Sequence, residues 1–232
     1  MPHRTQRHGL SFDYLGFDGS VMGLSDYQQT WAVQRAVHAD VASGQVGPQV
    51  LFVQHTPVYT AGRRTEPHER PFDGTPVVDV DRGGKITYHG PGQLVGYPIV
   101  TLTRKIGPLE YVRRLEQAVI DVLAGYGIEA GRVDGRTGVW LPADSRRGER
   151  KICAIGIRVA KMTTMHGFAL NVTAQATGPF GNIVPCGISD AGVTSMEDEL
   201  GHAAPELMEV AAALEPLLTR HLDFAWALDA AS

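Results

Sequence analysis

The chain has 232 residues, of which 43% are hydrophobic and 20% are charged, and its formal net charge is −4. This length supports a full hydrophobic core in one domain, and two cysteines exclude the dense disulfide framework of small secreted proteins. No long apolar segment follows the basic residues 1–8, so we expect no secretory signal, no transmembrane span and a cytoplasmic location.

Charge is unevenly distributed along the chain. From residue 197 to the end, eight acidic residues stand against Arg220 alone, and the basic residues gather in two clusters within 63–85 and 146–161. Such clusters are either solvated faces or a docking surface for an acidic partner, because complementary fields steer encounter. No stretch has the basic and aromatic interleaving of a nucleic-acid platform.

The predicted strands and helices are interspersed without strict βαβ alternation, which favours an α+β fold over a doubly wound sheet. The predicted strands lie at 10–17, 49–54, 77–80 and 94–100, in two short stretches within 128–141, and at 151–160 and 166–172. The first predicted helix is capped by Ser25, and two more begin at Pro108 and Pro205. Pro216 is expected to kink or end the last one. Ser195 and Asp198 resemble a capping box.

Two polar stretches are predicted to be loops. Residues 55–64 are rich in turn residues, and loops of that length inside compact domains tend to be functional or mobile. Residues 143–150 are expected to be exposed.

The densest glycine run of the chain covers residues 81–93. Four glycines and a proline alternate there with polar residues such as Arg82, Thr87 and His89, so backbone can approach a bound group that is surrounded by donors. The run matches neither common phosphate-loop pattern, so no nucleotide is inferred. A plain glycine-rich hairpin connection explains it equally well.

Small residues recur in the two strands predicted at 151–160 and 166–172, which are expected to be antiparallel neighbours. They are Ala154, Gly156, Gly167 and Ala169. A floor of small side chains would suit a slim apolar ligand, although close packing of the strands explains the same residues.

Cys186 stands in a turn that can present its thiol. Pro185 fixes its own φ and lacks an N–H, and Gly187 can take a positive φ. A lone cysteine is also often a small buried hydrophobe. As a nucleophile, Cys186 would need a group that holds it as a thiolate.

Four residues are candidates for that group: His55, His89, His166 and Lys151. Lys151 opens an otherwise apolar strand, which places its amine at the rim of a pocket. There it would lower the thiol pKa by its charge or take the proton itself. A snorkelling lysine at a strand end fits the pattern equally well.

Metal binding and serine hydrolysis are two competing chemistries that the sequence does not support. The chain has no CxxC, HxxxH or HExxH pattern, so no metal site is expected. It has no GxSxG pattern of a serine hydrolase. A bridge between Cys153 and Cys186 stays open, although a cytosolic chain keeps its thiols reduced.

Four separate motifs resemble those of the lipoyl(octanoyl) transferases in order and approximate spacing. They are Arg82-Gly-Gly-x-x-Thr-x-His-Gly-Pro-Gly-Gln93, Lys151-x-x-Ala-Ile-Gly156, His166-Gly-Phe-Ala-Leu-Asn171 and Pro185-Cys-Gly187. The resemblance covers about residues 10–200, and several motifs in register make it specific.

The resemblance implies a fold like the catalytic domains of biotin and lipoate protein ligases, with a larger mixed sheet, a smaller sheet and flanking helices. We expect a disordered segment at 1–9, one catalytic domain at 10–222 and a tail at 223–232.

The resemblance also implies a reaction, in which an octanoyl group moves from acyl carrier protein to a lysine of a lipoyl domain. The expected acceptors are the lipoyl domains of 2-oxoacid dehydrogenase complexes and the glycine cleavage H protein. We expect a monomer that needs no cofactor and binds neither nucleic acid nor membrane.

By the same resemblance, Cys186 is expected to carry the acyl thioester and Lys151 to activate it. The implied substrate-binding residues are Arg82, Gly83, Gly84, Lys85, Ile86, Thr87, Tyr88, His89, Ala154, Ile155, Gly156, Gly167, Phe168 and Ala169. Cys153 stands where the family usually has a small residue, and we expect it on the same sheet face as Lys151. The alternatives are an ATP-dependent lipoate or biotin ligase and a non-catalytic acyl-binding module.

Overall fold

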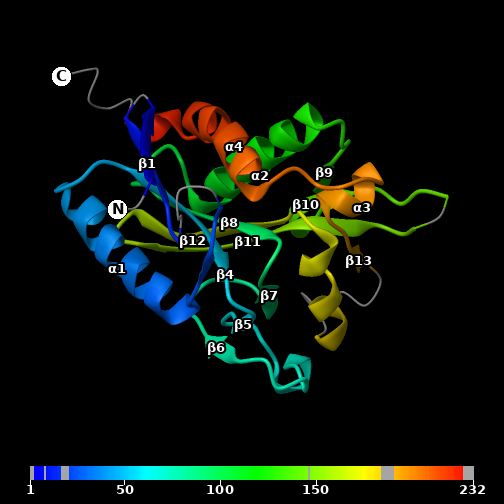
Figure 1. The fold of residues 1–232 in the computed structure, drawn as a ribbon. Coiled ribbons are helices and arrows are strands. Elements are labelled where there is room, and N and C mark those ends of the chain that lie inside the picture. Colours follow the sequence, from blue (N-terminus) through cyan, green and yellow to red (C-terminus); the bar gives the residue numbers. More distant parts are fainter. Residues whose placement is uncertain (1–2, 8, 17–20, 146, 184–190, 227–232) are drawn as a thin grey trace.

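A large mixed sheet forms the centre of the molecule, and a small sheet lies beside it (Figure 1). The computed structural model describes residues 3–7, 9–16, 21–145, 147–183 and 191–226. The large sheet runs in the order β1 (His3–Arg7), β2 (Leu10–Tyr14), β4 (Gln49–His55), β8 (Gln93–Ile99), β12 (Thr163–Asn171), β11 (Arg150–Ala160), β10 (Arg136–Leu141) and β9 (Gly131–Val133). Two short strands extend it, β3 (Leu24–Ser25) beside β4 and β13 (Gly192–Val193) beside β11.

The small sheet has the order β6 (Val77–Asp79), β5 (Val58–Ala61) and β7 (Thr87–His89). One large mixed sheet, one small sheet and flanking helices confirm the α+β fold expected from the sequence.

Helices cover both faces of the large sheet. They are α1 (Tyr27–Ser43), α2 (Pro108–Gly125), α3 (Met196–Leu200) and α4 (Leu207–His221), with short 3-10 helices at Pro67–Glu69, Ala174–Ala176, Gly178–Asn182 and Asp223–Ala225. Helix α1 packs on β4, β8 and β12, while α2 and α4 pack together on the opposite side (Figure 1). None of the described helices is both long and apolar enough to cross a membrane.

The alternation of side chains along β4 shows how the two layers form. Leu51 and Val53 pack in one core cluster with Val41 of α1, whereas Val50 and Phe52 pack in the larger cluster shared with α2 and α4. Successive side chains of a strand point to opposite faces, so a fully apolar run belongs in a sheet that is covered on both sides.

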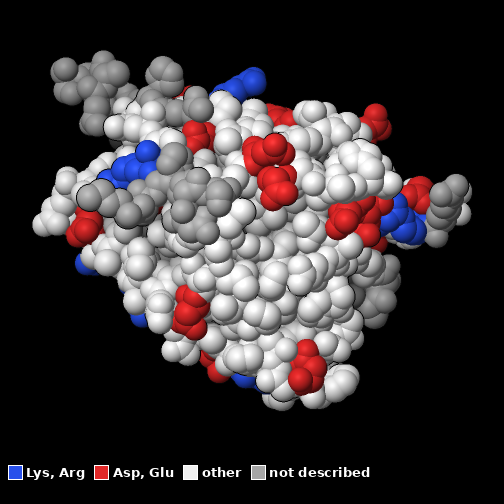
Figure 2. Space-filling model, viewed as in Figure 1, with Lys and Arg blue, Asp and Glu red and all other residues white. Residues whose placement is uncertain are grey.

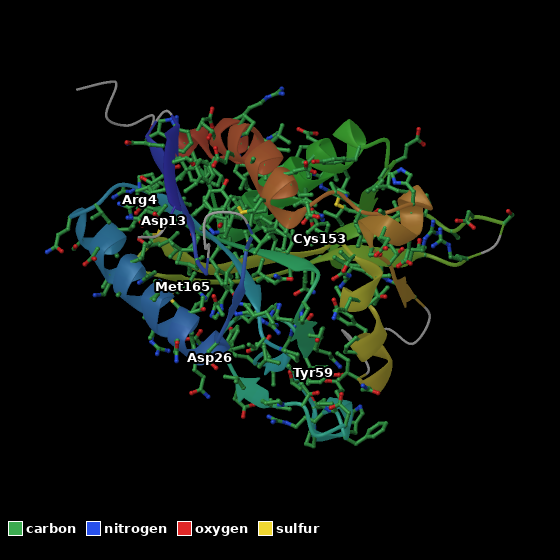
Figure 3. All side chains as sticks on the ribbon, in the orientation of Figure 1. Arg4, Asp13, Asp26, Tyr59, Cys153 and Met165 are labelled. Carbon is green, nitrogen blue, oxygen red and sulfur yellow. The ribbon has the colours of Figure 1, made fainter. Side chains whose placement is uncertain are left out.

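A separate aromatic cluster holds the small sheet. It consists of Tyr59, Ile86, Tyr88, Phe180 and Ile183, and Figure 3 shows Tyr59 in this part of the molecule. The rings of Tyr59 and Tyr88 have centroids 5.3 Å apart, and those of Tyr88 and Phe180 are 6.0 Å apart. The half-buried Val193 of β13 packs against the same cluster.

The start of α1 differs from the sequence expectation. Asp26, not Ser25, caps the helix, because its Oδ1 accepts the N–H of Gln29 at 2.9 Å. Ser25 lies in β3, paired with His55. Asp26 lies at the N-terminal end of α1 in Figure 3. Serine and aspartate are both good N-cap residues. Because Ser25 is held in a strand by the pairing of β3 with β4, the cap falls on Asp26.

Short strands were missed where turn residues dominate the sequence. Strand β5 lies inside the predicted loop at 55–64, and β7 lies inside the glycine run. Residues His3–Arg7, expected in a disordered segment, pair with β2. In the expected tail at 223–232, Phe224 is buried. The domain boundaries otherwise stay predictions.

The last long helix also differs from expectation. Helix α4 begins at Leu207, after a capping box between Glu206 and Glu209, and continues through Pro216 to His221. Ser195 caps α3 (Met196–Leu200), since its hydroxyl oxygen accepts the N–H of Asp198 at 3.1 Å. The Asp198 carboxylate accepts from the Ser195 hydroxyl at 2.7 Å, so only the N-cap half of the predicted capping box is confirmed.

Gly96 leaves the space that Phe168 fills on the neighbouring strand. A Cβ at Gly96 would lie 2.3 Å from Phe168 Cζ, so we expect Gly96→Ala to lower the free energy of unfolding by about 1–3 kcal/mol. Gly125→Ala is the matched control, because beyond its chain neighbours and the nearby backbone of its own helix no described atom lies within 4 Å of its Cβ position in α2. This substitution should raise that free energy by up to about 1 kcal/mol. Urea unfolding of both variants measures this, and equal effects would contradict the packing described.

Candidate active site

A cavity of about 400 Å³ opens between the glycine-rich run and strand β11. It is lined by Arg64, Gly83, Gly84, Lys85, Ile86, Thr87, Val112, Gly135, Arg136, Thr137, Lys151, Ala154, Ile155, Gly156 and Ile157. The N–H of Gly83 donates to the carbonyl of Ile157 at 3.0 Å, which fixes the run against β11. We call this the outer cavity.

A smaller inner cavity of about 40 Å³ adjoins it. The two cavities share Thr87, Ala154, Ile155 and Gly156. The remaining lining residues are Tyr27, Arg82, His89, Val95, Tyr97, His166, Gly167, Phe168 and Ala169. The paired strands β11 and β12 bring Gly156 opposite Gly167 and Ala154 opposite Ala169, so the small residues do form one wall.

The structure brings the predicted substrate-binding residues to these two cavities, with the exception of Tyr88. Its side chain is buried in the aromatic cluster of the small sheet and lines neither cavity. Lys151 lines the outer cavity. Cys186 and the Pro185–Gly187 turn lie outside the described residues.

Two residues of β10 hold the Lys151 side chain. A Cβ at Gly138 would lie 3.5 Å from Lys151 Cε and 3.6 Å from Cδ, so the glycine leaves room for the aliphatic stem. The ammonium lies over the indole ring of Trp140, 4.5 Å from its centroid. Such a cation–π contact holds an ammonium against the face of the ring.

A bulge in β11 separates Lys151 from Cys153. Val139 pairs with Cys153, yet the next residue, Trp140, pairs with Lys151. The additional residue breaks the alternation of side chains, so Cys153 turns into the core beside Ile152.

The expectation that Cys153 shares the sheet face of Lys151 is therefore wrong. Figure 3 shows Cys153 among the side chains between the sheet and helices α2 and α4. Burial raises the pKa of its thiol well above the usual range. A fully buried thiol in that state is a poor nucleophile.

Arg82 holds the glycine-rich run in place. Its side chain is buried and donates to the carbonyls of Thr60, Gly83 and Lys85 at 2.7, 3.0 and 2.8 Å. A Cβ at Gly156 would come within 2.9 Å of Arg82 Cδ. Arg82 thus lies against β11 where the two cavities meet.

A chain of buried hydrogen bonds extends from the small sheet to the segment beside Lys151. His89 Nδ1 lies 2.8 Å from Gln93 Oε1, and Gln93 Nε2 donates to Asn171 Oδ1 at 2.9 Å. Asn171 Nδ2 donates to the carbonyl of Thr194 at 2.9 Å, and the N–H of Thr194 donates to the carbonyl of Lys151 at 3.0 Å.

The donor and the acceptor in each of these side-chain hydrogen bonds follow from the last acceptor, the carbonyl of Thr194. Because a backbone carbonyl only accepts, Asn171 must donate its amide there, and the oxygens of Asn171 and Gln93 then accept. His89 therefore carries its proton on Nδ1, and Nε2 accepts from the hydroxyl of Thr60 at 3.3 Å. Burial holds the pKa of His89 well below its usual value, which agrees with a neutral ring.

The other two histidines are also buried and neutral. His55 Nδ1 donates to the carbonyl of Ser25 at 3.1 Å, and its Nε2 accepts from Tyr97 at 2.8 Å. His166 Nε2 lies 2.8 Å from Asp81. Burial lowers the pKa of each ring to about 4. Of the four candidates for activating a thiol, only Lys151 lines the outer cavity.

Several members of the predicted basic clusters are paired with carboxylates. Arg150, expected in an exposed loop, is buried at the start of β11, where its Nε donates to Glu199 Oε1 at 2.8 Å. Further ion pairs join Arg70 to Asp79, Lys85 to Glu69, Arg147 to Glu199 and Arg158 to Asp81. On the face in Figure 2, acidic side chains are more prominent than basic ones. Arg147 and Arg150 thus leave less charge available for a docking surface than the sequence indicated.

Sequence reasoning missed residues that join the site from other segments. Arg64, Val112, Arg136 and Thr137 line the outer cavity, and Tyr27 and Tyr97 line the inner one. Of these residues, Arg64 had a signal in the sequence, because it lies in the predicted loop at 55–64 and in the basic cluster within 63–85. In the described part of the chain, no group of three or more His, Cys, Asp or Glu side chains is placed to hold a metal ion.

Comparisons with known proteins agree with this architecture. Residues 26–219 match the family described as the lipoyl protein ligase A/B catalytic domain. An octanoyltransferase of Cutibacterium acnes is 58% identical over 222 residues, which cover 93% of this chain and 81% of that protein. An octanoyltransferase of Salinispora tropica is 56% identical over 200 residues, covering 86% of this chain and 91% of that protein.

Among solved structures, lipoate-protein ligase A bound with ATP shares the fold. Its TM-score is 0.63 at 15% identity, over 88% of this chain and 84% of that one.

The buried histidines make stability depend on pH. In the unfolded chain a histidine titrates near pH 6.5, whereas burial lowers the pKa of His55 and His166 to about 4. Between these values the unfolded state binds more protons. The free energy of unfolding should therefore fall as pH is lowered, by about 1.4 kcal/mol per pH unit for each ring.

Urea unfolding at pH 7.5 and pH 5 tests this dependence. His166→Gln should reduce the difference between the two pH values, while His202→Gln, at an exposed position, should leave it unchanged. Equal stability of the unsubstituted protein at both pH values would contradict the neutral, buried rings.

Proposed function

Because this chain belongs to the lipoyl protein ligase A/B catalytic domain family, we propose that it transfers an octanoyl group through a covalent acyl-enzyme on Cys186. The chain is an acyltransferase of protein lipoylation, as its similarity to octanoyltransferases supports. The donor is octanoyl-acyl carrier protein. The acceptor is the lysine of a lipoyl domain, in 2-oxoacid dehydrogenase complexes or the glycine cleavage H protein.

The first half-reaction exchanges one thioester for another. The Cys186 thiolate attacks the octanoyl carbonyl, the bond from that carbonyl to the carrier sulfur breaks, and the leaving thiolate takes a proton from the Lys151 ammonium. Products are an octanoyl thioester on Cys186, the carrier thiol and a neutral Lys151. Because the two thioesters have similar bond energies, this step depends mainly on positioning and charge stabilisation.

The second half-reaction forms the amide. The amine of the acceptor lysine attacks the Cys186 thioester, and neutral Lys151 takes a proton from the attacking nitrogen. Cys186 leaves as a thiolate beside the restored ammonium, so the enzyme returns to its starting state. One lysine thus serves as acid in the first step and as base in the second.

The observation that carries the proposal is the cavity that Lys151 shares with the glycine-rich run. Small residues of β11 and β12 line the adjoining inner cavity, and small side chains leave room for a slim acyl chain. Backbone of Gly83 and Gly84 forms the opposite wall. Apolar Ile86 and Ile157 complete a lining suited to a hydrocarbon chain.

Two described residues on either side of the segment that contains Cys186 support its place in the site. Ile183 belongs to the same buried cluster as Ile86, which lines the outer cavity. Val193 pairs directly with Lys151. The chain enters the segment at the cavity wall and leaves it beside the strand of Lys151, so we expect the thiol to reach the lysine amine.

Incubation with two kinds of donor separates the proposal from its alternatives. Octanoyl-acyl carrier protein should add one octanoyl group to the protein without ATP, as intact-protein mass would show. An ATP-dependent ligase would instead form an adenylate from ATP and free octanoate. A non-catalytic binding module would gain no covalent mass from either mixture.

Replacing each cysteine distinguishes the nucleophile from the buried thiol. Cys186→Ala should lower the rate of octanoyl transfer to a lipoyl domain by on the order of 1000-fold or more. Cys153→Ala is the matched control and should keep most of the activity, because Cys153 lies in the core and lines neither cavity. Transfer at full rate by Cys186→Ala would exclude the covalent mechanism.

Replacing Trp140 tests whether its ring holds the Lys151 ammonium. Trp140→Leu should slow formation of the acyl-enzyme by roughly 2- to 30-fold relative to Trp140→Phe, since phenylalanine keeps an aromatic face. Single-turnover measurement of the first half-reaction gives the two rates, and urea unfolding checks that both variants are folded. Equal losses in both variants would show that only packing at this position matters.

A further inference from the structure

We propose that Arg64 binds the phosphate of the donor's phosphopantetheine arm at the mouth of the outer cavity. The inference rests on the proposed function, in which the octanoyl thioester arrives on such an arm. In an acyl carrier protein the thioester is at one end of this arm and a phosphodiester is at the other. A site that accepts the thioester near Lys151 must therefore accommodate an anion farther out.

The outer cavity has a strongly positive lining. Arg64, Lys85, Arg136 and Lys151 all contribute to its walls, and no aspartate or glutamate is among the lining residues that the structure describes. A hollow lined by charges of one sign concentrates ligands of the opposite sign. The lining therefore favours an anionic ligand, and a neutral acyl chain alone does not account for it.

Three of these cations already have partners in the protein. Lys85 pairs with the buried carboxylate of Glu69. Arg136 pairs with Glu149 at 3.4 Å. The Lys151 ammonium lies over the ring of Trp140.

Arg64 is exposed, and within the described ranges it has no ion pair with an acidic side chain. Among the described lining residues, its guanidinium is thus the cation that is available to an external anion.

The backbone around Arg64 is fixed relative to the cavity wall. The N–H of Arg64 donates to the carbonyl of Gly84 at 3.1 Å, and the N–H of Thr65 closes a turn to the carbonyl of Gly62 at 3.0 Å. A Cβ at Gly62 would lie 2.4 Å from the oxygen of Gly84, so the turn packs tightly on the glycine-rich run. The Arg64 side chain therefore starts from a defined point at the cavity.

Guanidinium chemistry suits this ligand. Arginine binds phosphate oxygens through two parallel N–H groups and keeps its charge at all relevant pH values. The neighbouring Arg63 is also exposed but does not line the cavity. It carries the same charge one residue away, which makes it a matched control for any general attraction between the protein and an acidic donor.

Three donors and two variants test the inference. The donors are octanoyl-acyl carrier protein, octanoyl-4′-phosphopantetheine and octanoyl-pantetheine, which lacks the phosphate. Arg64→Gln should raise KM about 10-fold for both phosphate-bearing donors and leave KM for octanoyl-pantetheine unchanged. Arg63→Gln should leave KM for the two small donors unchanged. Added salt should weaken the preference of the unsubstituted protein for phosphate-bearing donors.

Each other outcome overturns the inference. An effect of Arg64→Gln on the carrier protein alone would mean that Arg64 contacts the carrier's acidic surface. An equal effect on all three donors would mean a structural role, and no effect would exclude any role in donor binding. If the unsubstituted protein accepts no octanoyl thioester at all, the proposed function itself fails, which is a distinct result.

Discussion

The buried hydrogen-bond chain from Thr60 to the carbonyl of Thr194 is the constraint on which the site depends. It begins in the small sheet, crosses two central strands of the large sheet through Gln93 and Asn171, and ends beside Lys151. An unsatisfied polar group in a dry interior is costly, so every link must be made in the folded state. These hydrogen bonds thereby fix the glycine-rich run relative to β11, the strand that carries Lys151.

Around this constraint, the motif residues divide into two kinds. Arg82 and His89 build the walls. Arg82 donates to backbone carbonyls, and the neutral ring of His89 bonds to Thr60 and Gln93. Lys151 and Arg64 instead face the outer cavity. The family resemblance alone placed Arg82 and Lys151 in one active site and did not separate residues that build the walls from residues that face the cavity. The proposed mechanism therefore assigns the chemistry to few side chains, and the others keep the cavity open.

The sequence predicted the parts of the fold that depend on regular periodicity and failed where long-range pairing decides. The apolar run of β4, the helix α2 and the hairpin of β11 and β12 followed from side-chain patterns. The strands β5 and β7 are three or four residues long and lie among turn residues, so no local pattern marks them. The bulge that turns Cys153 away from Lys151 depends on pairing with β10. Equally, nothing near Arg64 or Arg150 in the sequence reveals which of them meets a carboxylate.

The central claim is that Cys186 carries the octanoyl group during the reaction. The most direct measurement is to trap the protein with an octanoyl donor in the absence of a lipoyl acceptor, digest it, and locate the added group by tandem mass spectrometry. The account predicts the octanoyl group on the peptide that contains Cys186, attached through a bond that hydroxylamine cleaves, as a thioester requires. An octanoyl group attached to Lys151 or Cys153, or no covalent adduct under conditions that support transfer, would contradict it.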